Sequence, residues 1–174
     1  RRGRRAVLTG SFVPRLFCCL ALRVEVCFLL VSTTEPSMAT GGVSSFAEFR
    51  LSAGALKALA QMGIETPTPI QAVAIPELLD GRDVIGQART GSGKTLAFGI
   101  PALEVVDPNQ RTVQVLILTP TRELATQVAS VLEELGGGRG IEVGLLFGGR
   151  AEGPQRLMLK RGVHVVVGTP GRVL

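Results

Sequence analysis

Beyond residue 50, stretches in which apolar residues recur at helical spacing alternate with short runs that are apolar throughout. The short runs lack the polar alternation of a half-exposed strand, so they are typical of parallel strands covered on both faces. The fold class that this alternation indicates is α/β, with a doubly wound parallel sheet. It predicts helices near 51–62, 70–79, 94–105, 121–135 and 153–161, and strands at 83–86, 113–118, 143–147 and 163–167.

Capping and turn residues mark the ends of these elements. Ser52 is expected to cap the first helix and Gly63 to end it. If residues 120–125 are an ordinary helix start, Thr119 is expected to cap the helix at 121–135. Pro101 falls inside the helix at 94–105, where we expect a kink. Each expected strand leads into a turn that contains glycine or proline. Because ligands bind at the carboxyl ends of parallel strands, we expect the functional residues along that edge of the sheet.

The turn after the first expected strand spans residues 88–95 and reads Ala-Arg-Thr-Gly-Ser-Gly-Lys-Thr. Small residues at this spacing let backbone N–H groups surround a polyphosphate, and the N-terminus of the following helix adds positive potential. In such a loop the lysine, Lys94, reaches the β- and γ-phosphates, and the hydroxyl of Thr95 binds Mg²⁺. The alternative is an ordinary glycine-rich turn, which does not call for this lysine and threonine. The segment predicts a nucleotide site, although Ala88 stands where the common pattern has glycine.

Composition and charge add little about partners. The chain of 174 residues is 45% apolar, which suits one globular domain. Of its net charge of +5, residues 1–37 contribute +4, with six arginines and two glutamates, and residues 38–174 contribute +1. All three cysteines lie in residues 1–37, so the remainder has no disulfide framework. His164 stands in an apolar run, where we expect it to pack rather than to bind a metal or act as a base.

Residues 1–37 differ from the rest of the chain and admit three interpretations. The basic segment 1–5 precedes an apolar stretch at 16–31, as in a secretory or twin-arginine export signal. A membrane-spanning helix needs about 20 apolar residues, whereas this stretch is shorter and contains Arg23 and Glu25. The third interpretation is an unstructured or non-native extension ahead of a start at Met38. We favour the third, because the composition changes abruptly after Met38.

A candidate base-binding segment lies upstream of the loop. Residues 63–71 read Gly-Ile-Glu-Thr-Pro-Thr-Pro-Ile-Gln, and Phe46 lies seventeen residues before Gly63. The amide of Gln71 offers both the donor and the acceptor that an adenine edge requires. Thr68 and Gln71 also fit a capping box for the next helix, so both interpretations stay open on this segment alone.

Three further segments follow expected strands. Residues 120–125 read Pro-Thr-Arg-Glu-Leu-Ala, which fits either an ordinary helix start or a contact with a phosphate. Gly148-Gly149 is a weak signal alone, since most such pairs are turns. Residues 169–172 read Thr-Pro-Gly-Arg, in which the arginine can pair with a phosphate.

In this order and at these spacings, the five segments resemble the DEAD-box family of ATP-dependent RNA helicases, from about residue 45 to the end of the chain. The family's loop characteristically begins with alanine, as at Ala88, and usually has an aromatic residue where this chain has Ile64. The resemblance implies a phosphate-loop, RecA-like first helicase domain, incomplete here. It also implies ATP and Mg²⁺ as cofactors, and RNA held by its sugar-phosphate backbone with little sequence preference.

The resemblance assigns a role to each matching residue. Lys94 and Thr95 take part in catalysis, and Thr95 holds the metal. Contacts to ATP are expected from Phe46, Thr66, Gln71, Ala88, Arg89, Thr90, Gly91, Ser92, Gly93, Lys94 and Thr95. Contacts to RNA are expected from Pro120, Thr121, Arg122, Gly148, Gly149, Thr169, Pro170, Gly171 and Arg172.

We therefore expect an extension at 1–37, a Q-motif region at 38–72 and a partial ATP-binding domain at 73–174, from a cytoplasmic enzyme that opens RNA duplexes. In the family the Asp-Glu-Ala-Asp motif comes one helix and one strand later, so residues 1–174 alone are expected to be inactive and to expose a sheet edge. One alternative is a non-catalytic nucleotide- or RNA-binding module that ends at Leu174. Another is a different phosphate-loop enzyme, such as a small-molecule kinase.

Overall fold

The computed structural model describes residues 43–174, and the expectations for residues 1–37 lie outside them. The helices are η1 (Phe46–Glu48, a 3₁₀ turn), α1 (Ala53–Gln61), α2 (Pro69–Leu79), α3 (Lys94–Glu104), α4 (Arg122–Gly137), α5 (Glu152–Arg161) and α6 (Pro170–Val173). The strands are β1 (Val115–Leu118), β2 (Val143–Leu146) and β3 (Val165–Gly168). None of the helices in the described part is long and apolar enough to cross a bilayer.

The three strands form one parallel sheet in the order β1-β3-β2. Gly168 is in register with Leu118 on one side and with Leu146 on the other, so the carboxyl ends of all three strands meet at one edge. All four residues of the central strand β3 are buried. The parallel, strand–helix alternation confirms the α/β prediction.

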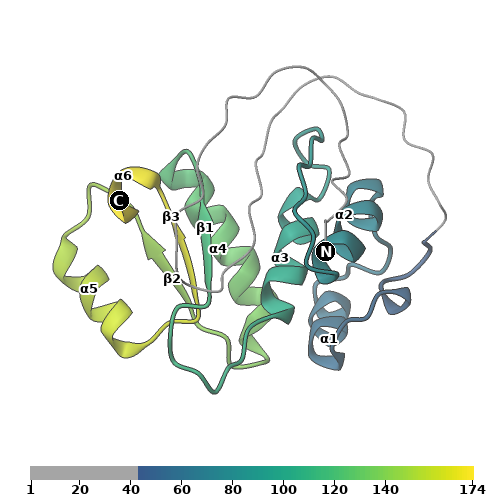
Figure 1. The fold of residues 1–174 in the computed structure, drawn as a ribbon, viewed down its shortest axis with the longest axis horizontal. Coiled ribbons are helices and arrows are strands. Elements are labelled where there is room, and N and C mark those ends of the chain that lie inside the picture. Colours follow the sequence, from purple (N-terminus) through teal and green to yellow (C-terminus); the bar gives the residue numbers. More distant parts are fainter. Residues whose placement is uncertain (1–42) are drawn as a thin grey trace, which may run out of the picture.

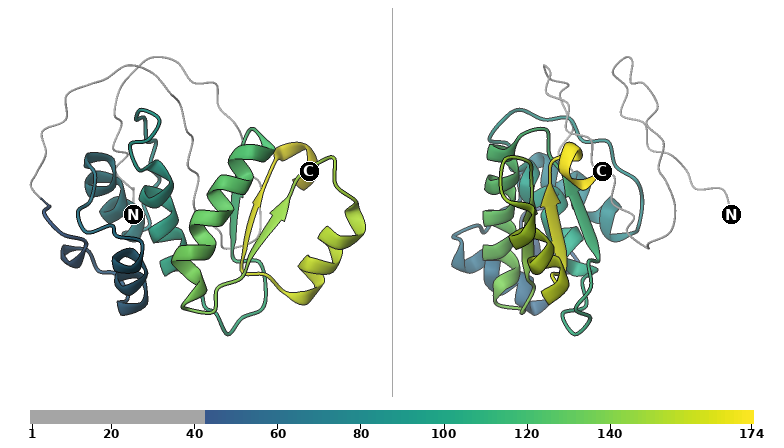
Figure 2. Two further views of the ribbon diagram at one scale, coloured as in Figure 1. Left: turned by 180° about the vertical axis from the view of Figure 1, so that it is seen from behind. Right: turned by 90° about the vertical axis from the view of Figure 1, so that its left-hand side faces the viewer.

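The elements lie in layers. Figure 1 shows α5 and the sheet on one side of α4, with α3, α2 and α1 on the other. The same order is seen from behind, where α4 stands between α3 and the strands (Figure 2). The contacts agree, since α4 packs on β2, β3, α1 and α3, and α3 packs on α2. The helix that follows the phosphate loop is therefore enclosed between α2 and α4.

The two faces of the sheet meet different helices. Val165 and Val167 belong to the main core cluster, which also contains the buried residues of α4. The opposite face carries Gly144, where an added Cβ would lie 2.7 Å from the terminal methyl carbon of Met158 in α5. The close approach of α5 at this position requires glycine.

The residues that end and cap α1 are those predicted from the sequence, whereas the cap of α4 is a different residue. Ser52 caps α1, with its hydroxyl accepting the Ala55 N–H, and Gly63 follows α1 with a left-handed φ of +70°. The expected cap at Thr119 is wrong: Thr121 caps α4 through its hydroxyl, which accepts the Leu124 N–H at 3.2 Å. Thr119 is instead buried and donates its hydroxyl to the Thr121 carbonyl. Its N–H donates to the Gly168 carbonyl, so the backbone of Thr119 still belongs to the sheet and not to α4.

The strand expected at 83–86 is also wrong. Within the described residues this segment makes only isolated bridges, at Val84 and Gln87, and does not join the sheet. A strand needs a neighbour to receive its backbone hydrogen bonds, and β1 pairs only with β3 in this part of the chain. The apolar side chains that predicted a strand remain partly on the surface. Ile85, in segment 83–86, is 62% exposed, and Leu118, at the end of β1, is 50% exposed.

His164 is a packing residue, as expected. It is buried ahead of β3, where Nδ1 accepts the Glu142 N–H at 2.9 Å and Nε2 lies 3.1 Å from the Pro108 carbonyl oxygen. An acceptor at Nδ1 and a donor at Nε2 correspond to one neutral tautomer. Both ring nitrogens are used to hold the loop before β1 against the start of β2.

Candidate nucleotide and RNA site

Residues 88–95 curl into a compact loop immediately before α3. Gly91 and Gly93 have φ angles of +80° and +85°, in the left-handed region that favours glycine. Gly93 is the N-cap of α3, so the unbonded N–H groups of the first helical turn open onto the loop. The loop thus presents backbone donors at the positive end of a helix, the arrangement that binds phosphate.

Lys94 lies within the curl of this loop. Its Nζ donates to the Arg89 carbonyl at 2.6 Å and to the Ala88 carbonyl. The ammonium is therefore held between the two ends of the loop, beside the backbone donors. A polyphosphate in the loop would offer the same ammonium stronger, charged acceptors.

Gln71 of α2 connects the base-binding segment to the loop. Its side chain is 1% exposed; Nε2 donates to the Gly93 carbonyl at 3.0 Å and Oε1 accepts the Thr68 N–H at 2.9 Å. A Cβ on Gly93 would overlap Gln71 Nε2. The capping interaction predicted from the sequence is present, and the contact with Gly93 is one that no sequence signal had revealed.

Two buried hydroxyls on residues of this contact region make no hydrogen bond of ordinary geometry, although the Thr68 hydroxyl faces the backbone N–H of Gln71 as in a capping box. They are Thr68 Oγ1 and Ser92 Oγ. Thr68 Oγ1 lies 3.1 Å from the position that a Cβ on Gly93 would take, so it faces the loop. Buried hydroxyls without partners are costly, and polar groups of a ligand would satisfy them. The loop and its surroundings therefore fit a nucleotide phosphate.

The other two residues predicted to contact ATP lie apart from the loop's curl. Phe46 is 3% exposed and packs edge-on against Phe49, with ring centroids 5.9 Å apart. Thr66 is exposed in the turn ahead of α2. Phe46 thus has its ring within the core and not on the surface.

At the carboxyl edge of the sheet, two of the predicted RNA-binding segments meet. Arg122 begins α4, and a Cβ on Gly149 would lie 2.7 Å from its Cζ, so its guanidinium covers the glycine pair that follows β2. Gly149 has a φ of +84°. The Thr121 hydroxyl caps the same helix end. The arginine, the glycines and a helix N-terminus are therefore brought together.

The third segment joins the same edge. The Thr169 N–H donates to the Leu146 carbonyl at 2.9 Å, and Thr169 is the N-cap of α6, which contains Arg172. The pKa of Glu152, at the start of α5, is lowered mainly by its hydrogen bond from Arg156 and slightly by the charge of Arg172. Arg172 therefore lies near the segment that follows Gly148-Gly149. Pro120, ahead of α4, and Pro170 and Gly171, at the start of α6, are exposed.

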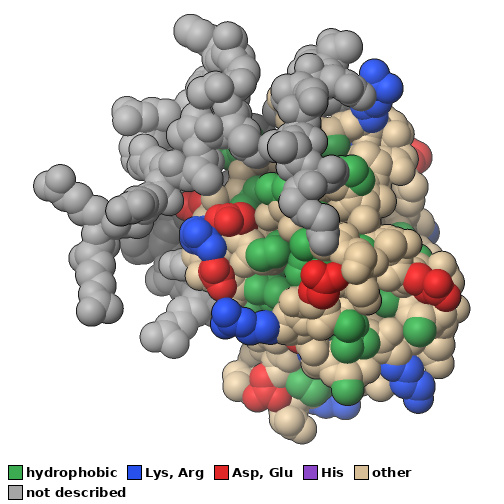
Figure 3. Space-filling view, turned by 90° about the vertical axis from the view of Figure 1, so that its right-hand side faces the viewer, with side chains coloured by type: hydrophobic (Ala, Val, Ile, Leu, Met, Phe, Trp, Pro, Cys, Tyr) green, Lys and Arg blue, Asp and Glu red, His purple; other side chains and the backbone are tan. Residues whose placement is uncertain are grey.

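A metal centre and the face formed by α1 and α2 were the remaining candidates for a site in the described part. Its histidine and acidic side chains form no cluster of three that could hold a metal ion. The face on the side of α1 and α2 carries basic, acidic and hydrophobic side chains intermingled, where it is not covered by grey atoms (Figure 3). Mixed charge of this kind does not mark a nucleic-acid surface.

A parallel α/β sheet with a glycine loop, a lysine inside that loop and a helix N-terminus behind it defines a phosphate-loop nucleotide-binding domain. The comparison with known families is more specific. Residues 68–174 match the DEAD/DEAH box helicase family. The chain belongs to this family.

Individual proteins similar to this chain are also helicases or DEAD-box proteins. The ATP-dependent RNA helicase DeaD of Klebsiella pneumoniae is 52% identical over 132 residues, which cover 75% of this chain and 20% of the relative. The DEAD-box ATP-dependent RNA helicase CshA of Bacillus subtilis is 46% identical over 130 residues, covering 75% and 26%. The crystal structure of a DEAD box protein from Methanococcus jannaschii superposes with a TM-score of 0.72 at 45% identity, covering 75% of this chain and 36% of that one. The chain thus spans about a fifth to a quarter of the length of these two helicases.

Proposed function

We propose that residues 43–174 form the ATP-binding face and part of the RNA-binding edge of an ATP-dependent RNA helicase. The observation that carries the proposal is the phosphate loop, in which Gly91 and Gly93 adopt left-handed angles and Lys94 Nζ lies within the curl. Support also comes from the family and from its relatives, which are named as ATP-dependent RNA helicases. We also propose that the protein works in the cytoplasm, where both of its proposed ligands, RNA and ATP, are available.

In this proposal the loop binds the triphosphate of ATP. Backbone N–H groups of residues 91–95 contact the phosphate oxygens, and Lys94 exchanges its carbonyl partners for the β- and γ-phosphates. The Thr95 hydroxyl serves as a ligand of Mg²⁺, which completes its coordination with phosphate oxygens and water. Bound magnesium would supply charge neutralisation on the phosphates.

The base would be recognised by Gln71. After its bonds to Gly93 and Thr68, the amide retains one N–H and one oxygen lone pair, which is the pair that the N6 and N7 edge of adenine needs. Because Gln71 is buried, adenine reaches it only after a local shift of the residues that cover it. Phe46 and Thr66 contribute from the same segment.

RNA would bind along the carboxyl edge of the sheet. Arg122 and Arg172 provide charge, the N-terminus of α4 provides backbone donors, and Gly148-Gly149 lets a phosphate approach the backbone. We propose that unwinding belongs to the whole protein. Residues 1–174, which contain no Asp-Glu-Ala-Asp sequence, bind nucleotide without hydrolysing it.

The test is a competition assay with a fluorescent ATP analogue and residues 1–174, displaced by MgATP or MgGTP. We expect ATP to displace the probe at lower concentration than GTP, and Lys94→Ala to weaken ATP binding by about tenfold or more. Arg156→Ala, a cation change on the exposed face of α5, is the control and should leave both affinities unchanged. Equal binding of ATP and GTP would remove the adenine assignment, and unchanged binding by the Lys94 variant would remove the phosphate assignment.

A further inference from the structure

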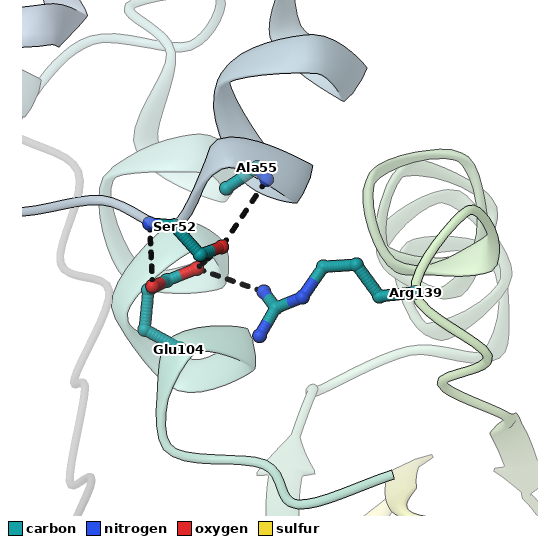
Figure 4. A network of polar contacts seen from close by, with 4 residues as sticks. All are labelled: Ser52, Ala55, Glu104 and Arg139. Atoms are coloured by element: carbon teal, nitrogen blue, oxygen red, sulfur yellow. Dashed lines mark hydrogen bonds and ion pairs between the residues drawn. The ribbon is translucent and has the colours of Figure 1, made fainter.

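Glu104 is the last residue of α3, at the end opposite to the phosphate loop, and its carboxylate is the centre of a polar network (Figure 4). Oε2 accepts the Ser52 N–H at 2.9 Å, and Oε1 accepts the Ser52 hydroxyl at 2.8 Å. Arg139 Nη1 also donates to Oε1, at 2.8 Å. The Ser52 hydroxyl in turn accepts the Ala55 N–H, so the carboxylate holds the residue that caps α1.

Arg139 is fixed as closely as Glu104. The two side chains are only 16% and 13% exposed, so this ion pair is largely removed from solvent. The aliphatic stem of Arg139 lies against Gly54 of α1, where an added Cβ would come within 2.8 Å of its Cγ. Three segments meet at Glu104: the start of α1, the end of α3 and the loop that follows α4.

The segment that carries the expected base-binding residues is therefore attached to both ends of α3. At the loop end, Gln71 donates to the carbonyl of Gly93. At the far end, Glu104 holds Ser52, about 16 Å away along the helix axis at 1.5 Å per residue. Apolar packing of α2 on α3 already holds the segment, and the two polar attachments add a fixed point at each end of α3 that sets its orientation relative to the loop.

We propose that Glu104 is a positioning residue for nucleotide recognition. Through Ser52 it sets the orientation of residues 46–71 on α3, and thereby aligns the base-binding side of the site with the phosphate-binding loop. The inference rests on the proposed function, because it takes Gln71 as the adenine contact. Glu104 touches neither base nor phosphate, so removing its carboxylate should weaken base recognition while phosphate binding persists.

The experiment compares two ligands that share the phosphates and differ in the base. Dissociation constants of MgATP and of magnesium tripolyphosphate are measured for residues 1–174 by competition with the fluorescent probe. For Glu104→Gln we expect the dissociation constant of ATP to rise about fivefold and that of tripolyphosphate to change by less than about twofold. Glu152→Gln is the matched control, since it removes a carboxylate from an exposed ion pair on α5 and should change neither constant.

Ser52 supplies a second, milder pair of variants in case Glu104→Gln does not fold. Ser52→Ala removes the hydroxyl that Glu104 holds, and Ser52→Thr retains it. Ser52→Ala should raise the dissociation constant of ATP and leave that of tripolyphosphate unchanged. Ser52→Thr should keep both constants close to those of the unmodified chain. A hydroxyl needed only for helix stability would affect both ligands together.

The measurements distinguish failure of the positioning role from failure of the proposed adenine site. Selective loss of ATP binding in Glu104→Gln or in Ser52→Ala supports the positioning role. Equal loss of both ligands, or no loss of either, overturns it while leaving ATP binding by the unmodified chain intact. If the unmodified chain itself binds ATP no better than tripolyphosphate, the adenine site fails, and the inference fails with it.

Discussion

Gln71, on α2, donates its side-chain N–H to the carbonyl of Gly93, 3.0 Å away, at the residue that precedes α3. The contact leaves no room for a side chain on Gly93, whose φ of +85° is in any case unfavourable for other residues. Gly93 therefore takes a left-handed conformation in the loop, caps α3 and accepts a hydrogen bond from α2.

Gly93→Ala should destabilise the fold more than Gly91→Ala. Both residues have left-handed angles, so each alanine should cost about 1–2 kcal/mol in backbone strain. Only the Cβ on residue 93 meets Gln71; a Cβ on residue 91 has nothing within 4 Å. The displaced hydrogen bond should add about 1 kcal/mol for Gly93→Ala. Urea unfolding of both variants measures the difference, and equal losses would contradict the contact.

Gly149→Ala should weaken RNA binding through Arg122. The new Cβ would displace the guanidinium, since Cζ would lie only 2.7 Å from it. Gly153→Ala is the matched control, because a Cβ there has nothing within 4 Å and residue 153 is not among the expected RNA contacts. If Arg122 contacts a phosphate, Arg122→Gln should reduce the salt slope of binding by about one. Fluorescence anisotropy with single-stranded RNA at several salt concentrations checks both points; an unchanged slope would exclude that contact.

His164→Leu should lower the free energy of unfolding by about 2–4 kcal/mol. The leucine fills the buried space, but the Glu142 N–H and the Pro108 carbonyl lose the partners that Nδ1 and Nε2 provide. Nucleotide affinity should stay the same, because these groups lie away from residues 88–95. Thermal or urea unfolding measures the loss, and a neutral substitution would show that the ring bonds contribute little.

Arg156→Gln should raise the pKa of Glu152 toward its ordinary value of 4.5. In the folded chain the hydrogen bond from Arg156 lowers that pKa, so the interaction contributes to stability above the unfolded pKa. The contribution is lost as the pH falls through the lowered folded value. Both groups are exposed, so the effect on stability should be small. A carbon-detected NMR titration of the Glu152 carboxyl measures the shift, and an identical titration in both proteins would contradict it.

The sequence predicted the elements that depend on local pattern. Ser52 and Gly63 were assigned correctly because a hydroxyl cap and a left-handed glycine are local features. Thr119 was wrongly assigned because the sequence does not show that its N–H bonds to Gly168, 49 residues away. The segment 83–86 had the composition of a strand, but pairing depends on a neighbouring strand, and none lies beside it within residues 43–174.

The candidate site was predictable to the extent that it consists of contiguous motifs. Residues 88–95 and 120–125 carry their spacing in the sequence. The contacts of Gln71 with Gly93 and of Glu104 with Arg139 join positions 22 and 35 residues apart, and no local sequence pattern predicts them. Phe46 illustrates the converse, since an aromatic residue expected at the nucleotide has its ring in the core.

Among the three strands of the described residues, the central strand β3 is the last one to be synthesised. β1 and β2 both pair with β3, and Val165 follows its partner Val115 by fifty residues. At about 5–20 residues per second, a ribosome needs roughly 2.5–10 s to make that interval. Until β3 is made, β1, and later β2, have no backbone partner in residues 43–174, although the segments that form α1 to α4 are complete before β2 begins. A nascent chain that ends before Val165 should therefore be the form that a chaperone binds, and one extended past Gly168 should release it.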